Sequence, residues 1–234
     1  MIILGIETAT TQVGCALGGQ EGVLASFHAA RGRRHAETLA PAIEFICKHA
    51  RIELREVTVV AVDVGPGLFT GLRVGLATAK AMATALRVPM IGLSSLDLLA
   101  FPVRRTSRLV VPVIDARRDE VFTATYRQVP GGAQRISEPR LTTPEELFSD
   151  LRADGQDCLL VGDGALRHST VFTDPRIEIG TAGDAYPSAT ALVELAQPRA
   201  LREQFVLPSE LEPCYLRRSD AEINWERRGS AEAS

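Results

Sequence analysis

The segment from Asp63 to Leu86 most restricts what this chain can fold into. A β-branched run from Thr58 to Val64 ends at a Gly-Pro-Gly turn, and residues 70–86 then suit a helix with only two charged side chains. The other residues of this helix are Ala, Gly, Leu, Val, Met and Thr, and they surround its axis instead of forming one stripe. A helix that is apolar on every side is a buried helix. Because a chain of 234 residues has a limited core, we expect a second protein to cover part of this helix.

The composition is that of an ordinary globular protein, with room for one large domain or two small ones. A formal charge of −3 gives no electrostatic case for strong nucleic-acid binding by this chain alone. The four cysteines lie far apart, which indicates buried, reduced thiols instead of a disulfide framework or a zinc site. The N-terminus lacks the pattern of a signal peptide, and no apolar run reaches membrane-spanning length. We therefore expect a cytoplasmic protein with no membrane partner.

The first half of the chain is predicted to hold three strands, a helix, a strand, a helix, a strand and a last helix. Their expected ranges are, in order, 2–6, 13–17, 23–29, 35–50, 58–64, 70–86, 89–93 and from about 95 onward, with Ser94 as the last helix's N-cap.

The helix over 35–50 has apolar residues on two sides. Helical spacing predicts a core face, made by Ala36, Leu39, Ala40, Ile43, Ile46, Cys47 and Ala50. The opposite side is less polar than a solvent face should be, and it carries Thr38, Pro41, Ala42 and Phe45. Pro41 within the pattern predicts a kink or a late helix start.

The second half repeats this order, which predicts an α/β fold of two β-β-β-α-β-α units with the second unit reduced. Its expected ranges are strands at 109–114, 121–127, 134–137 and 158–162, a helix after Thr143, and a helix at 188–196. Each half opens with an apolar strand that ends in an acid, Glu7 or Asp115, and this suggests a duplication. We expect subdomains at 1–106 and 107–219, the segment 208–218 to return across the fold, and a disordered tail at 220–234.

A doubled unit with an acid at the first turn is the layout of the actin, sugar-kinase and Hsp70 ATPase superfamily. There, a glycine-containing hairpin in each half holds the ATP phosphates, because only glycine lets the backbone amides come close. In this chain the first hairpin, Glu7–Thr11, has Thr and Ala, and the second has Arg117 and Arg118 at its tip. We therefore expect the superfamily's fold without its ATP chemistry.

Other patterns in the chain do not predict a catalytic, cofactor or metal site. Gly65, Pro66, Gly67 and Gly71 could form a phosphate loop at a helix start, but no Gly-Lys-Ser/Thr follows them. We favour a tight structural turn there. A metal-binding helix would pair His35 with a histidine four residues on, where the chain has leucine.

Six motifs occur in an order that resembles a known family. They are Ile3-x-x-Ile-Glu7-Thr-Ala-Thr10, Arg34-His-Ala-Glu-Thr-Leu-Ala-Pro41, Gly65-Pro-Gly-Leu-Phe-Thr-Gly-Leu-Arg73, Gly92-Leu-Ser-Ser95, Pro112-Val-Ile-Asp-Ala-Arg-Arg-Asp-Glu-Val121 and Pro213-Cys-Tyr-Leu-Arg217. Together they resemble the bacterial tRNA threonylcarbamoyladenosine biosynthesis protein family TsaB, also called YeaZ, over nearly the whole chain. Leu68 and Ala36 depart from it, since serine is usual at the first position and common at the second.

The resemblance implies a non-catalytic paralogue of the transferase TsaD, which attaches threonylcarbamoyl to adenosine 37 of ANN-decoding tRNAs. It implies a heterodimer with a TsaD-like transferase through the first two helices, a TsaE-like ATPase docked on that pair, and a homodimer when the chain is alone. ATP, Mg²⁺ and metal are then expected on the partner subunits, with no cofactor on this chain and tRNA met only through the complex. No His-x-x-x-His occurs here, as expected for the paralogue.

We accordingly place the partner interface on helices 35–50 and 70–86. The residues predicted to form it are Thr38, Pro41, Phe45, Arg73, Leu76, Ala77 and Lys80. Two other functions stay open at this point, an ATP-dependent phosphotransferase of the same superfamily and a glycoprotease-like metallopeptidase.

Overall fold

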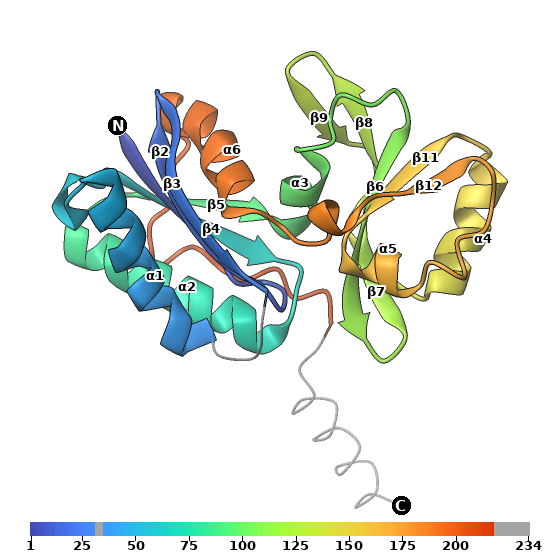
Figure 1. The fold of residues 1–234 in the computed structure, drawn as a ribbon, viewed down its shortest axis with the longest axis horizontal. Coiled ribbons are helices and arrows are strands. Elements are labelled where there is room, and N and C mark those ends of the chain that lie inside the picture. The colour runs from blue at the N-terminus through green and yellow to red at the C-terminus, as the bar shows by residue number, and fades with distance from the viewer. Residues whose placement is uncertain (31–34, 218–234) are drawn as a thin grey trace, which may run out of the picture.

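The computed structural model describes residues 1–30 and 35–217, which form two α/β lobes side by side (Figure 1). The predicted tail at 220–234 lies outside the described residues. Among the described helices none is both long enough and apolar enough to cross a membrane. The described cysteines are free thiols; Cys15, Cys47 and Cys158 are buried and Cys214 is half-buried.

The first lobe has the predicted order of elements around a five-stranded sheet. The strands are β1 (Ile2–Glu7), β2 (Val13–Gly19), β3 (Gly22–Ala29), β4 (Val59–Gly65) and β5 (Met90–Ser94), in the order β3-β2-β1-β4-β5. The helices are α1 (His35–Ala50), α2 (Phe69–Leu86) and α3 (Ser95–Ala100), with a short 3-10 turn at Leu54–Glu56. β1 pairs antiparallel with β2 and parallel with β4. Ser94 caps α3 as predicted, because its side chain accepts a hydrogen bond from the Leu96 N–H at 3.3 Å.

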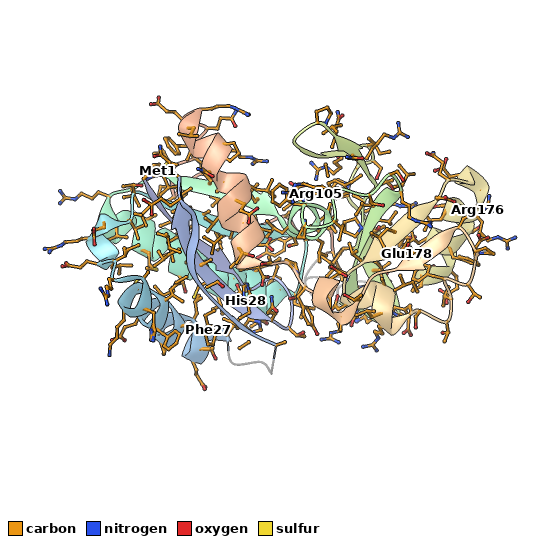
Figure 2. All side chains as sticks on the ribbon, turned by 45° about the horizontal axis from the view of Figure 1, so that its top comes forward. Met1, Phe27, His28, Arg105, Arg176 and Glu178 are labelled. Carbon is orange, nitrogen blue, oxygen red and sulfur yellow. The ribbon has the colours of Figure 1, made fainter. Side chains whose placement is uncertain are left out.

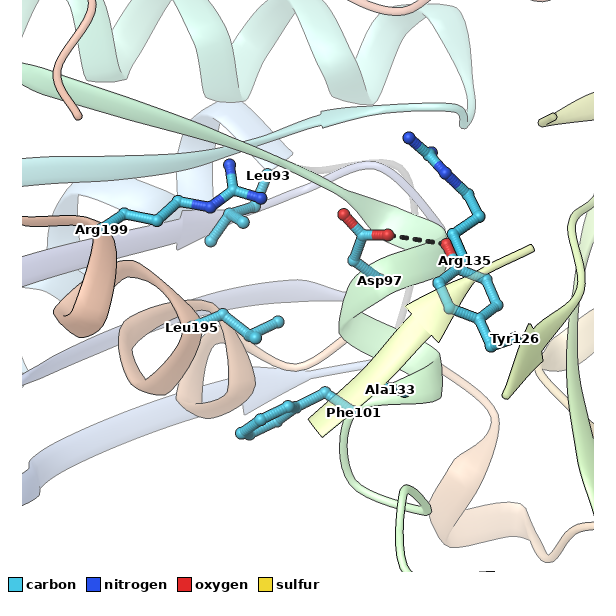
Figure 3. Close-up of a pocket in the computed structure, with 8 residues that line it drawn as sticks. All are labelled: Leu93, Asp97, Phe101, Tyr126, Ala133, Arg135, Leu195 and Arg199. Carbon is cyan, nitrogen blue, oxygen red and sulfur yellow. Dashed lines mark hydrogen bonds between the residues drawn. The ribbon is translucent and has the colours of Figure 1, made fainter. Parts of the chain in front are cut away.

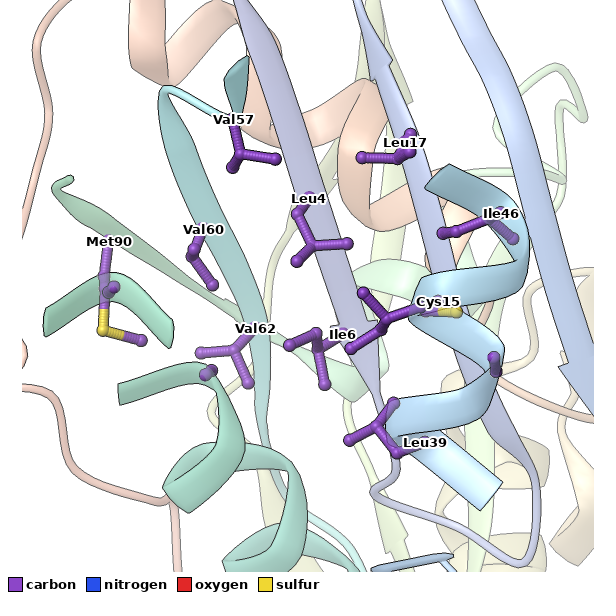
Figure 4. Packing of buried hydrophobic residues seen from close by; sticks show 14 of the residues in the cluster. Leu4, Ile6, Cys15, Leu17, Leu39, Ile46, Val57, Val60, Val62 and Met90 are labelled. Atoms are coloured by element: carbon purple, nitrogen blue, oxygen red, sulfur yellow. The ribbon is translucent and has the colours of Figure 1, made fainter. Parts of the chain in front are cut away.

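Helices cover both faces of this sheet, which explains why β1 is apolar without alternation. Leu4 and Ile6 of β1 belong to one core, to which α1 and α2 contribute Leu39 and Ala79 (Figure 4). Ile3 belongs to a second core, which also contains buried residues of the helix α6 (Ala189–Leu201).

The second lobe has more strands than the sequence predicts. They are β6 (Leu109–Arg117), β7 (Glu120–Thr123), β8 (Tyr126–Val129), β9 (Gly132–Arg135), β10 (Arg140–Thr142), β11 (Cys158–Val161) and β12 (Ile177–Ile179). The sheet runs β10-β7-β6-β11-β12, with β8 paired to β6 and β9. Two helices belong to this lobe, α4 (Pro144–Asp154) and α5 (Asp163–Arg167), and Thr143 forms the predicted capping box of α4.

The single strand predicted over 121–127 is wrong. The chain leaves the ladder between β7 and β8, where the Thr125 N–H donates to Ser137 Oγ at 2.8 Å and the Thr125 carbonyl accepts from the Ile136 N–H at 2.8 Å. As a result β7 pairs with β10 on its outer edge, whereas β8 continues into a separate hairpin with β9.

The last helix, α6, lies in the range expected for the second subdomain but packs on the sheet of the first lobe. His28 of β3 accepts a hydrogen bond from the Ala189 N–H at 3.2 Å, at the start of α6 (Figure 2). A Cβ added to Gly5 of β1 would lie 2.9 Å from Val193 Cγ2 of α6, so helix and sheet are in close contact. The boundary expected at 106–107 therefore does not divide the packing of the chain.

The segment after α6 runs back along the first lobe, as the sequence analysis expects of residues 208–218. Val206 forms an antiparallel bridge with Met90 of β5. The Cys214 N–H donates to the Val64 carbonyl at 2.7 Å, next to the Gly-Pro-Gly turn. The end of the described chain is thus attached to the turn from which α2 begins.

Candidate functional site

The turn between β4 and α2 is pressed against the first hairpin. Gly65 has a φ of +101°, which favours glycine, and the Gly65–Pro66 peptide bond is cis. The Leu68 N–H donates to the Ala9 carbonyl at 2.7 Å, and a Cβ on Gly67 would lie 2.3 Å from that same oxygen. The turn therefore contacts the β1–β2 hairpin backbone to backbone.

Glycines in the first two turns of α2 continue this contact. Thr8 Oγ1 of the hairpin donates to the Gly71 carbonyl at 2.8 Å. A Cβ on Gly71 would lie 2.1 Å from the Thr8 carbonyl oxygen, and one on Gly75 would lie 2.2 Å from Thr8 Oγ1. Only residues without a side chain leave room for such an approach.

The hairpin that would hold phosphate in the superfamily is consequently covered. Thr8, Ala9 and Thr10 are all buried. His35, the first residue of α1, donates from Nε2 to the Thr10 carbonyl at 2.9 Å. The Ala9 N–H, which a phosphate would need as a donor, donates instead to Glu7 Oε1 at 2.8 Å. The start of α2 and His35 therefore cover this hairpin.

Beneath this cover lie two buried acids on neighbouring parallel strands, Glu7 of β1 and Asp63 of β4. Asp63 Oδ1 accepts from Ser95 Oγ at 2.6 Å and from the Gly65 N–H at 2.8 Å. Burial raises the pKa of Asp63 to about 7, and burial together with the nearby Asp63 raises the pKa of Glu7 well above its ordinary value. Near neutral pH we expect the pair to hold at least one proton.

The corresponding acid of the second lobe, Asp115, has cationic neighbours. Its carboxylate accepts from Arg117 Nη1 at 2.9 Å and from Arg167 Nη1 at 3.2 Å. Arg117, Arg118 and Asp119 at the tip of the β6–β7 hairpin all have positive φ, between 55° and 65°. Arginine side chains and a left-handed backbone thus stand where the superfamily has glycine. Within the described residues no group of three or more His, Cys, Asp and Glu side chains could hold a metal ion.

The residues predicted to form the partner interface lie on α1 and α2, but not all of them face outward. Those that are exposed are Pro41, Phe45, Arg73 and Ala77; those that are half-buried are Thr38 and Lys80. Leu76 is only 7% exposed and belongs to the core between α2 and the sheet. Leu76 therefore packs on the core side of α2 and is not part of its outer face.

Helix α1 also differs in detail from its prediction. It begins at His35 and includes Pro41 in its interior, so the late start is wrong. Ala42, which the sequence places on the outer side, is buried, whereas Ala36 and Ala40, which it places on the core side, are exposed. Alanine is small enough for either side of a helix, so spacing alone assigns it poorly.

An apolar groove runs between α1 and α2. Its volume is about 690 Å³, and its apolar lining includes Ile43, Ile52, Leu54 and Met82. Glu44, Lys48 and Glu53 add charges to the lining. Phe45, which is 51% exposed, stacks on His49 with ring centroids 4.1 Å apart. The two helices therefore present an apolar surface with charged groups along it, as protein interfaces do.

Two parts of this surface are not predicted from the sequence. Ile52 and Leu54 follow α1 in a connecting segment, and their apolar character outside any periodic pattern was the available signal. The other part is a cluster at the start of α2, where the Arg73 guanidinium lies 3.8 Å from the centre of the Phe69 ring and Arg73 Nε donates to the Tyr215 hydroxyl at 3.2 Å. No local signal in the sequence brings Tyr215 to that position.

Two lobes with this topology define the class of protein, the actin, sugar-kinase and Hsp70 ATPase superfamily, as the sequence predicts. Within it, the family model described as "TsaD: tRNA N6-adenosine threonylcarbamoyltransferase" matches residues 23–225, and the chain belongs to this family. The fold is shared more distantly with the activator of the 2-hydroxyisocaproyl-CoA dehydratase from Clostridium difficile, at a TM-score of 0.51 and 11% identity over 92% of this chain and 100% of that one.

The most informative relatives carry the names TsaB and YeaZ. The chain is 27% identical to the tRNA threonylcarbamoyladenosine biosynthesis protein TsaB of Bacillus subtilis, over 96% of this chain and 98% of that protein. The crystal structure of YeaZ from Pseudomonas aeruginosa superposes with a TM-score of 0.82 at 26% identity, covering 92% of this chain and 99% of that one. The resemblance expected from the six motifs is therefore confirmed.

Proposed function

We propose that this chain is a non-catalytic scaffold in the synthesis of threonylcarbamoyladenosine at position 37 of ANN-decoding tRNAs. The observation that carries this proposal is the combination of a covered first hairpin with an apolar face on α1 and α2. The Ala9 N–H of the hairpin already donates within the chain, whereas the helix face has a groove of about 690 Å³ that the described residues leave open. Its relatives named for threonylcarbamoyladenosine biosynthesis give the reaction to which such a scaffold would belong.

In this proposal a TsaD-like transferase binds the α1–α2 face, and a TsaE-like ATPase docks on the resulting pair. Phe45 and the groove walls Ile52 and Met82 would supply apolar contacts, and Arg73 and Lys80 would supply charges from elsewhere on α2. An apolar face of this kind would also allow the chain alone to form a homodimer, in which a second copy covers the same surface. ATP, Mg²⁺ and metal belong to the partner subunits, and tRNA is met through the complex in the cytoplasm.

The interface is tested by Ala77→Glu on the exposed side of α2. A carboxylate buried in an apolar interface without a cation loses its hydration, so we expect binding of the TsaD-like partner to weaken about tenfold or more. Binding is measured by calorimetry, and folding by the thermal midpoint of the isolated chain. Ala153→Glu, the same change at an exposed position of α4 in the other lobe, is the matched control and should bind normally. Normal binding by Ala77→Glu would place the interface elsewhere.

Two other functions have their own tests. Micromolar binding of Mg-ATP by the isolated chain, followed by phosphate transfer, would favour an ATP-dependent phosphotransferase. Stoichiometric zinc or iron in the purified protein, together with peptide cleavage, would favour a metallopeptidase. The role in tRNA modification is tested by depletion of the protein and nucleoside analysis of total tRNA, and an unchanged level of threonylcarbamoyladenosine would refute the proposal.

A further inference from the structure

A small pocket between the two lobes contains polar groups that the proposed scaffold role does not use. Its volume is about 250 Å³ (Figure 3). Arg199 and Leu195 of α6 form one wall, Arg135 of β9 and Tyr126 of β8 form the other, and Asp97 of α3 lies between them. The residues that line the pocket do not include residues of the β1–β2 hairpin or of the β6–β7 hairpin. The pocket is therefore separate from the hairpins that would hold a nucleotide.

The pocket contains two arginine side chains, and a hydrogen bond to the backbone orients one of them, Arg199. Arg199 Nη1 donates to the carbonyl of Gly92 in β5 at 3.2 Å, and among the described residues its other N–H groups are left for a ligand. The ion pairs among the described residues include neither Arg199 nor Arg135. Figure 3 shows the two arginines on either side of Asp97.

Asp97 is already engaged, because its Oδ1 accepts the Tyr126 hydroxyl at 2.7 Å. Burial raises the pKa of Tyr126, and the Asp97 carboxylate adds to that rise. Two guanidinium groups against one carboxylate leave the pocket with an excess of positive charge. Leu195 and Phe101 add apolar lining beside these groups.

We propose that this pocket binds a small organic anion, whose carboxylate or phosphate group is held by Arg199 and Arg135. Arginine suits such groups because its planar fork donates two parallel hydrogen bonds to an oxyanion. The volume lies below the range of about 300–1,000 Å³ typical of sites for drug-sized ligands, so the ligand is small. Because Arg199 belongs to a helix of the first lobe and Arg135 to a hairpin of the second, the bound anion joins the lobes.

The experiment is an NMR titration of the whole chain with two probes, inorganic phosphate and propionate, at constant ionic strength with sodium chloride. We expect saturable shifts of the arginine Nε–H signals with at least one probe. The dissociation constant should rise about tenfold or more in Arg199→Gln and in Arg135→Gln, because each removes a charged hydrogen bond. Arg87→Gln, at an exposed position after α2, is the control and should bind as the parent does.

Saturation by phosphate alone assigns a phosphate-bearing ligand, and saturation by propionate alone assigns a carboxylate. The proposal is overturned if neither probe saturates, or if both arginine variants bind with the parent's dissociation constant. Should Arg199→Gln fail to fold, Arg135→Gln carries the test, since Arg135 is exposed on an edge hairpin.

Discussion

The two lobes place acids at equivalent positions and stabilise them by different means. In the first lobe Glu7 is the last residue of β1 and Asp63 lies in the neighbouring strand β4, and both are almost completely buried. In the second lobe Asp115 lies in β6 and Asp163 follows the neighbouring strand β11, and the Asp115 N–H donates to Asp163 Oδ1 at 3.0 Å. The first pair has raised pKa values beneath α2, whereas Asp115 forms ion pairs with two arginines within reach of water.

The two lobes therefore differ in what surrounds the corresponding hairpin. In the first lobe the glycines of α2 let a helix cover the hairpin, and the acids below it lose their solvent. In the second lobe the hairpin stays open, and arginines neutralise its acid. The cover on the first hairpin is the same helix that carries the proposed partner face, so that face is fixed to the centre of the lobe by backbone contacts.

The largest expected effect comes from removing the close fit of α2 on the first hairpin. In Gly71→Ala the new Cβ would lie 2.1 Å from the Thr8 carbonyl oxygen, and both groups belong to buried backbone. We expect the free energy of unfolding to fall by about 3 kcal/mol, even though alanine is the better helix former. Urea denaturation of the isolated chain measures this.

The matched control for that substitution lies in the second lobe. At Gly132, in the β8–β9 hairpin, an added Cβ would meet no atom within 4 Å. Gly132→Ala should therefore change the free energy of unfolding by less than about 0.5 kcal/mol. If Gly71→Ala were equally mild, α2 could move away from the hairpin freely, and the contrast between a covered and an open hairpin would be lost.

A second prediction uses the pKa of Asp63. Its ordinary value is 3.8 and burial raises it to about 7, so the folded protein binds more protons than the unfolded chain between about pH 4 and pH 7. Stability from this group is therefore present at low pH and falls as pH rises through that window. Asp63→Asn keeps an oxygen acceptor and removes the titrating group. Between pH 4 and pH 7 the free energy of unfolding of this variant should therefore fall by less than that of the parent, and the two losses should differ by about 2 kcal/mol or more.

The same measurement on Asp163→Asn sharpens the comparison between the lobes. The pKa of Asp163 is raised to about 6, mainly by burial, so its window ends about one pH unit lower than that of Asp63. The difference in pH-dependent stability between the parent and Asp163→Asn should accordingly be smaller than that for Asp63→Asn, and it should be complete by about pH 6. Thermal unfolding in buffers from pH 4 to pH 8 resolves both windows. Equal curves for the two variants would mean that the lobes do not differ in how they bury these acids.

Much of this comparison could be predicted from the sequence, because it rests on local patterns. Two apolar strands that end in Glu7 and Asp115, and a Gly-Pro-Gly turn before a small-residue helix, indicate the two units and the close-packed turn. Which side of that helix faces the core could not be predicted, since Ala77 and Leu76 are both apolar and only one is buried.

Long-range placement was also beyond local patterns. The periodicity of residues 188–196 predicts a helix with a buried face, but it does not indicate which of the two sheets that face packs against. The position of α6 depends on Val193 fitting against Gly5, nearly two hundred residues away in the chain. The interlobe pocket, which needs Arg199 and Arg135 to lie on its opposite walls, has no signature in either local segment.

The smallest expected effect concerns the open hairpin. The Arg167 side chain is 53% exposed and shares the Asp115 carboxylate with Arg117. Arg167→Met should lower the free energy of unfolding by no more than about 1 kcal/mol, and by less in high salt, because Arg117 still neutralises the acid. Removing both arginines takes from Asp115, only 5% exposed, the two cations that pair with it among the described residues. The double variant should therefore cost more than the sum of the single ones. Urea denaturation of the four proteins measures this excess. If the losses in the free energy of unfolding simply add, water already solvates the Asp115 carboxylate effectively. The second hairpin would then depend on its arginines no more than an ordinary surface turn does.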